Sequence, residues 1–199
     1  MLVSISRREI LLLGASALSI STKISTQDEC LTFQQAAQIL DERCPSSFIN
    51  EVRRSGHFLY RGESITCPKV VDLDPDLFDP KTYGSEEAVR LFQCIEAKLS
   101  GSTATPSIGH IGTATKEDAR QWGDAVSIWP TSPEFGFIWP KQNDVFFPGT
   151  CSEQFVEGTD LAVALKLGKE VMIRGPSFLM FPDSYDNMLW SYIDSRQRS

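Results

Sequence analysis

The chain has 199 residues, of which 41% are hydrophobic and 23% charged, with a formal net charge of −7 and an isoelectric point near 4.9. This length suffices for one globular core and is short for two. The negative charge argues against broad binding to nucleic acid or to an anionic membrane, because both attract basic surfaces. We therefore expect small molecules or other proteins as partners.

The N-terminal segment resembles a twin-arginine export signal. Arg7 and Arg8 precede an uncharged, mostly apolar run over residues 10–21. This run is too short to span a bilayer, so we expect no stable membrane insertion. The alternative is a flexible N-terminal extension of a cytoplasmic protein. We assign residues 1–25 to this segment and residues 26–199 to a single domain.

Cysteines and histidines bear on the compartment and on metals. The five cysteines are widely spaced and form no C-x-x-C pair, which argues against a zinc site or a dense disulfide framework: Cys30, Cys44, Cys67, Cys94 and Cys151. One or two disulfides remain open if the chain is exported. Because the sequence contains only 2 histidines, a histidine-rich metal site is excluded and we expect no metal cofactor.

The N-terminal half begins with helical patterns. Thr32 and Gln35 form a capping box, which predicts a helix over 33–43. The later patterns predict, in chain order, a helical turn over 48–55, a strand over 58–62, an irregular acidic connection over 63–84, a helix from Ser85 to Gly101, a helix over 115–122, strands over 125–129 and 135–139, and a helix over 160–167.

Glu170 lies where that last helix leads into what we interpret as a buried strand pair. Residues 171–173 are apolar and precede the Gly175-Pro176 breaker, and residues 178–181 form the second predicted strand. A carboxylate at the start of a strand is commonly just solvated. A functional role for Glu170 therefore needs partners elsewhere in the chain.

Such partners are found in two further motifs, Leu-Tyr-Arg-Gly at 59–62 and Gly-Thr-Ala-Thr at 112–115. Glu170 itself lies in a third motif, Lys-Glu-Val-Met-Ile at 169–173. Their order resembles the ADP-ribosyltransferase fold, in the branch with an Arg, Ser-Thr-Ser, Glu signature, and also small transferase-like proteins of phages and large viruses. The resemblance covers residues 33–181. It implies an α+β fold of two small, mostly antiparallel sheets packed face to face, with flanking helices.

The resemblance implies NAD as the substrate and Glu170 as the catalytic carboxylate. Cleavage of the nicotinamide–ribose bond passes through an oxocarbenium-like state, which a carboxylate on the ribose hydroxyl stabilises. Arg61 would bind the phosphates through its planar guanidinium, and Gly62 would let the backbone come close. Arg61 could instead pair with an acid of the following loop.

The hydroxyls and aromatics have implied roles too. Thr113 and Thr115 would hold the nicotinamide-side ribose and orient the catalytic carboxylate. Thr115 is also a sufficient helix N-cap, and the two duties are compatible. Phe137 or Trp139 would stack on nicotinamide, and the sequence does not choose between them.

Two positions depart from the family pattern. Transferases acting on arginine or asparagine carry Glu or Gln two residues before the catalytic Glu, where this chain has Gly168. Ala114 replaces the central hydroxyl of the triplet. We therefore expect either an NAD-dependent ADP-ribosyltransferase with a protein acceptor, or an NAD glycohydrolase. The alternative is a catalytically silent binding module of the same fold. An exported enzyme would act outside the cell, as bacterial ADP-ribosylating toxins do.

Overall fold

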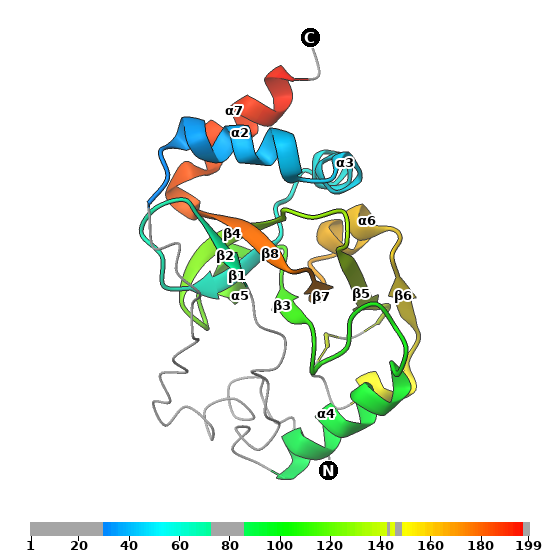
Figure 1. The fold of residues 1–199 in the computed structure, drawn as a ribbon. Coiled ribbons are helices and arrows are strands. Elements are labelled where there is room, and N and C mark those ends of the chain that lie inside the picture. Colours follow the sequence, from blue (N-terminus) through cyan, green and yellow to red (C-terminus); the bar gives the residue numbers. More distant parts are fainter. Residues whose placement is uncertain (1–29, 73–85, 143, 146–148, 197–199) are drawn as a thin grey trace.

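The computed structural model describes residues 30–72, 86–142, 144–145 and 149–196 (Figure 1). This part of the chain is α+β, with two four-stranded sheets and six α-helices. The first sheet has the strand order β1-β4-β8-β2 and the second has the order β3-β7-β5-β6. All strand pairs are antiparallel. The predicted α+β class with two small antiparallel sheets is therefore confirmed.

The elements have the following bounds. The helices are α2 (Phe33–Arg43), α3 (Ser46–Ser55), α4 (Glu86–Lys98), α5 (Lys116–Ala119), α6 (Leu161–Lys166) and α7 (Asp186–Ser195). The first sheet contains β1 (Tyr60–Glu63), β4 (Asp124–Pro130), β8 (Ser177–Pro182) and β2 (Lys69–Asp72). The second contains β3 (His110–Gly112), β7 (Val171–Arg174), β5 (Gly136–Pro140) and β6 (Phe155–Glu157). Two short 3-10 turns are η3 (Thr150–Ser152) and η4 (Asp183–Tyr185).

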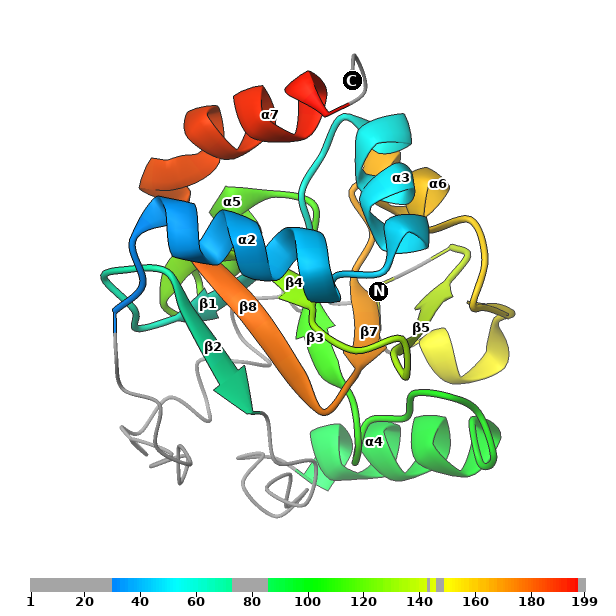
Figure 2. The same cartoon turned by 45° about the horizontal axis from the view of Figure 1, so that its top comes forward.

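Helices cover the sheets at opposite ends of the molecule. Helices α2 and α7 lie at the end of the first sheet, whereas α4 lies at the far end, beyond β3 and β7 (Figures 1 and 2). The main core joins both sheets, because Trp129 and Phe178 from the first pack in one cluster with Val171 and Ile173 from the second. A smaller cluster between α4 and the second sheet contains Met172.

Local sequence signals explain several helix starts. The Thr32 hydroxyl accepts from the Gln35 amide, and the Gln35 side chain accepts from the Thr32 amide at 2.8 Å, which confirms the capping box of α2. Thr115 caps α5 in the same way, because its hydroxyl accepts from the Asp118 amide at 3.2 Å. Helix α5 ends at Ala119, earlier than predicted.

Three elements were not expected from the sequence. Strand β2 lies inside the predicted irregular connection, where it pairs with the edge of β8. Strand β6 pairs with β5, and α7 packs Leu189 and Ile193 into the main core. Short strands such as β2 and β6 are stabilised by their neighbours more than by their own pattern. Residues 73–85 and the predicted export signal over residues 1–25 lie outside the described residues.

The predicted pairing of the two strands after Glu170 is wrong. Strand β7 belongs to the second sheet and β8 to the first, so that Gly175-Pro176 carries the chain from one sheet to the other. Both strands are buried as predicted. The apolar pattern reports burial and does not distinguish a hairpin from a crossing between sheets.

Four of the five cysteines form disulfides. Cys30 pairs with Cys67 across a Cα–Cα distance of 5.5 Å, and Cys94 pairs with Cys151 across 6.0 Å. The remaining Cys44 is buried, and this burial raises the pKa of its thiol. Within the described residues, no helix has the length and apolar character needed to cross a membrane.

Candidate functional site

The three motifs identified in the sequence lie on strands that meet where the two sheets join. The main chains of Tyr60 and Thr113 exchange two hydrogen bonds, of 2.7 Å and 2.8 Å, which connects β1 to the end of β3. Strand β3 pairs with β7, with Gly112 opposite Val171. Arg61 and Glu170 therefore each lie one residue from a position in this continuous ladder.

Arg61 reaches from β1 towards β3. Its Nε donates to Glu63 Oε1 at 2.6 Å and its Nη1 donates to the Ile111 carbonyl at 3.3 Å. Both side chains of the ion pair are partly exposed, at 27% for Arg61 and 30% for Glu63. The alternative that the sequence left open, pairing with a following acid, is thus observed. The guanidinium nevertheless stays at the sheet junction, within reach of solvent.

His110 is an electrostatic neighbour of Arg61. It lies on β3 opposite Ile173, and its ring meets the Phe178 ring edge to face at 6.3 Å between centroids. Burial, together with the positive charge of Arg61, lowers the pKa of His110 to about 3. The imidazole is therefore neutral at physiological pH and leaves Arg61 as the positive group of this pair.

The two threonine hydroxyls differ in their engagement. Thr115 Oγ1 donates to the Asp118 carboxylate at 2.6 Å while it accepts from the Asp118 amide, so that capping uses both its donor and an acceptor site. Thr113 is 6% exposed, and its Oγ1 accepts from the Thr115 amide at 3.4 Å, a long contact. The Thr113 hydroxyl is accordingly less committed to local structure than that of Thr115.

Glu170 directly precedes β7 and is half-buried. Its Oε2 accepts from the Val145 amide at 2.9 Å. Val145 belongs to the small cluster that packs under α4 with Met172, which is two residues after Glu170. The carboxylate is thereby directed to the α4 side of the second sheet.

Packing explains the presence of Gly62 and Phe137 without a role in ligand binding. A Cβ on Gly62 would lie 2.4 Å from the Ala119 carbonyl oxygen, so this glycine allows α5 to pack against β1. Phe137 is 6% exposed, sits opposite Ile173 on β5 and belongs to the main core. The structure thus gives Gly62 and Phe137 packing roles and does not bring Phe137 to the joint between β1 and β3.

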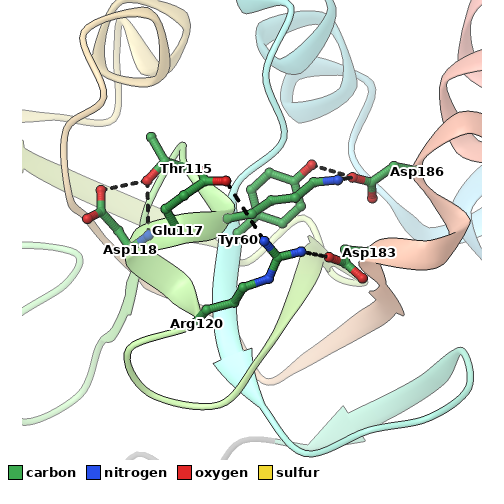
Figure 3. Close-up of polar contacts among 8 residues, drawn as sticks. Tyr60, Thr115, Glu117, Asp118, Arg120, Asp183 and Asp186 are labelled. Atoms are coloured by element: carbon green, nitrogen blue, oxygen red, sulfur yellow. Dashed lines mark hydrogen bonds and ion pairs between the residues drawn. The ribbon is translucent and has the colours of Figure 1, made fainter.

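A second polar group, which the sequence did not indicate, lies on the other side of Tyr60. The Tyr60 hydroxyl donates to Asp186 Oδ2 at 2.6 Å, and Lys116 Nζ contacts the same oxygen at 2.5 Å (Figure 3). Asp186 is 7% exposed, and among the described residues its Oδ1 has no hydrogen-bond partner. Burial and the Asp186 carboxylate both raise the pKa of Tyr60, so the phenol stays protonated.

This group borders an open pocket of about 310 Å³. The lining includes Tyr60, Lys116 and Trp190, and the Trp190 ring stacks on Phe58 at 4.2 Å between centroids. Arg120 ties α5 to η4 by an ion pair of 2.5 Å with Asp183 (Figure 3). The contact from Tyr60 to Asp186 spans 126 positions of sequence, so no local pattern could have announced it.

Comparisons of this chain with protein families, with curated proteins and with solved structures returned no match.

Proposed function

We propose that the protein is an NAD-cleaving enzyme, either an ADP-ribosyltransferase with a protein acceptor or an NAD glycohydrolase. The observation that carries the proposal is the meeting of β1, β3 and β7 at one joint between the sheets. This pairing supports the proposal because it puts the backbones of Arg61, Thr113 and Glu170 on or next to neighbouring strands.

The contacts of each residue suit the role proposed for it. Arg61 presents a permanently charged fork that already binds a carboxylate, and dinucleotide phosphates would compete with Glu63 for it. Neutral His110 adds no positive charge beside it. Thr113 is the better of the two threonines for the ribose hydroxyls, because Asp118 engages Thr115.

Glu170 would act on the ribose. A carboxylate that accepts from a backbone amide is oriented, which helps it to stabilise an oxocarbenium-like state. The carboxylate would accept from a ribose hydroxyl and so place negative charge near the breaking bond. NAD enters as a substrate in this scheme, and the proposal includes no metal.

A catalytically silent binding module is the second candidate. Gly168 supplies no side chain where acceptor-modifying transferases carry Glu or Gln. In addition, the Arg61 guanidinium already forms an ion pair with Glu63, which dinucleotide phosphates would have to displace. This candidate predicts that NAD or a protein partner binds without turnover.

We further propose that the protein acts after export. Two disulfides join Cys30 to Cys67 and Cys94 to Cys151, and such bonds persist in oxidising compartments. This agrees with the twin-arginine-like segment at Arg7 and Arg8. A cytoplasmic location would leave these cysteines as thiols.

The decisive test is nicotinamide release from NAD by the disulfide-bonded full chain. Glu170→Gln keeps the size of the side chain and removes its charge, and Glu134→Gln is the matched control on an exposed loop. We expect Glu170→Gln to lower kcat by roughly a hundredfold or more while Glu134→Gln does not, by analogy with losing one transition-state contact. Stimulation by a protein extract would indicate transfer. Folded wild type that binds NAD without releasing nicotinamide would support the silent module.

A further inference from the structure

The Glu170 carboxylate accepts a hydrogen bond from the main chain of a buried residue. The Val145 amide donates to Glu170 Oε2 at 2.9 Å. Val145 is 0% exposed and packs with Ile95 of α4 and with Met172 of β7. A displacement of this amide therefore removes a hydrogen bond that orients the carboxylate.

Two hydrogen bonds link described residues within the segment from Gln142 to Glu153, which carries Val145. Thr150 is 0% exposed, and its hydroxyl donates to the Asp144 carbonyl at 2.5 Å. The Gln142 amide donates to Glu153 Oε2 at 2.6 Å, which closes the two ends of the segment onto each other. A displacement at η3 is thereby passed on to the residue that precedes Val145.

This segment is attached to α4 by a covalent bond. Cys94 in the middle of α4 forms a disulfide with Cys151 in η3. Lys98, one turn later, donates to the Cys151 carbonyl at 3.0 Å and also to the Glu153 carbonyl. Helix α4 is in turn held to the chain before β3, because Glu96 accepts from the Ser107 amide at 2.9 Å.

We propose that the Cys94–Cys151 disulfide is a redox-sensitive clamp that positions the Glu170 carboxylate through Val145. Its consequence for catalysis rests on the proposed function. A dithiol reductant opens the clamp: one thiolate attacks a cysteine sulfur, the second thiol displaces the mixed disulfide, and two cysteine thiols form as the reductant becomes a cyclic disulfide. Two electrons pass from reductant to protein. Once the covalent bond is gone, the Lys98 hydrogen bonds remain, and these exchange readily with water.

The other disulfide provides a matched control. Cys30 and Cys67 lie near the start of α2 and before β2, and neither belongs to the segment around Val145. We compare the double variants Cys94→Ser/Cys151→Ser and Cys30→Ser/Cys67→Ser in the full chain, measuring nicotinamide release from NAD. Opening the clamp should lower kcat by roughly 10- to 100-fold with the KM for NAD changed by less than about threefold, as for a displaced catalytic group.

Chemical reduction of the disulfides adds a second test to this comparison of variants. Dithiothreitol should lower kcat in wild type and in Cys30→Ser/Cys67→Ser, and should have no further effect on Cys94→Ser/Cys151→Ser. A Cys94→Ser/Cys151→Ser variant with wild-type kcat would overturn the proposal. Since reduction of the folded wild type makes the same test, a variant that fails to fold does not leave the question open.

A second measurement separates this proposal from the proposed function. Hydrogen exchange of the Val145 amide, followed by NMR without NAD, should accelerate at least about tenfold on reduction, because exchange reports local opening. Thr150→Val removes the hydroxyl that holds Asp144, so it should also accelerate exchange of the Val145 amide. Thr150→Ser keeps a hydroxyl and should therefore exchange at the wild-type rate. Unchanged exchange at Val145 refutes the clamp even if NAD is cleaved. Accelerated exchange in a protein that never releases nicotinamide supports the clamp and refutes the NAD-cleaving function.

Discussion

Tyr60 and Thr113 are joined by two backbone hydrogen bonds, although 53 positions separate them; Tyr60 belongs to the first sheet, and Thr113 directly follows β3 of the second. Tyr60 therefore makes contacts in two separate parts of the fold. Its main chain joins β1 to the end of β3, while its hydroxyl binds Asp186 on the side of α7. Through this residue the Arg61 junction and the Asp186 group are mechanically connected.

Adding a side chain at Gly62 should strongly destabilise the fold. A Cβ there would lie 2.4 Å from the Ala119 carbonyl oxygen and 2.8 Å from the Gly123 amide nitrogen, and backbone atoms cannot move aside cheaply. We expect Gly62→Ala to lower the free energy of unfolding by about 1–3 kcal/mol or more. Urea denaturation of the disulfide-bonded protein measures this loss.

Gly112→Ala is the informative comparison for that measurement. Its Cβ would meet the Leu59 side chain at 2.8 Å, and a side chain can be shortened. The double variant Gly112→Ala/Leu59→Val should recover part of the stability lost in Gly112→Ala. If Gly62→Ala proved as stable as wild type, the tight contact of α5 with β1 would be disproved.

Local signals in the sequence explain why much of the fold could be predicted. The capping box at Thr32 and the N-cap at Thr115 act within three residues, so they are visible without tertiary structure. The pairing of β7 with β3 rather than β8, and the existence of β2, depend on partners that are distant in sequence. Such pairings are decided by the whole core and not by a local pattern.

The candidate site shows the same division. The order of the motifs around Arg61, Thr113 and Glu170 could be recognised in the sequence. The pairing of Arg61 with a following acid was also foreseen, but the distant partners were not, because Val145 reaches Glu170 across 25 positions and Ile111 reaches Arg61 across 50. Asp186 was missed because a lone acid near a helix start is ordinarily a surface residue.

Tyr60→Phe tests the buried hydrogen bond to Asp186. The change removes a donor from a carboxylate that is 7% exposed and leaves Lys116 as its described partner on Oδ2. We expect a loss of about 1–3 kcal/mol in the free energy of unfolding, because a buried charge becomes less satisfied. Tyr192→Phe is the matched control, since it removes a more exposed hydrogen bond, to Asp41. A loss no larger in Tyr60→Phe than in Tyr192→Phe would contradict this assignment.

Because the pKa of folded His110 is lowered, we expect the protein to lose stability in acid. Burial and the neighbouring Arg61 lower its folded-state pKa from the model-peptide value of 6.5 to about 3. Between these values the unfolded chain binds a proton that the folded chain does not, so this contribution to stability is full above pH 6.5 and is lost as the pH falls towards 3. The loss is up to about 1.4 kcal/mol per pH unit.

His110→Asn removes that titrating group, so its free energy of unfolding should fall less steeply than that of wild type between about pH 6 and pH 4. Urea denaturation at several pH values gives the two slopes, and their difference isolates His110 from the carboxylates that both proteins share. NMR makes a direct check on the folded protein, because the His110 ring resonances should stay unchanged on acidification from about pH 8 to pH 5. A ring that titrates near 6.5, or equal slopes in the two proteins, would contradict the lowered pKa of His110 beside Arg61.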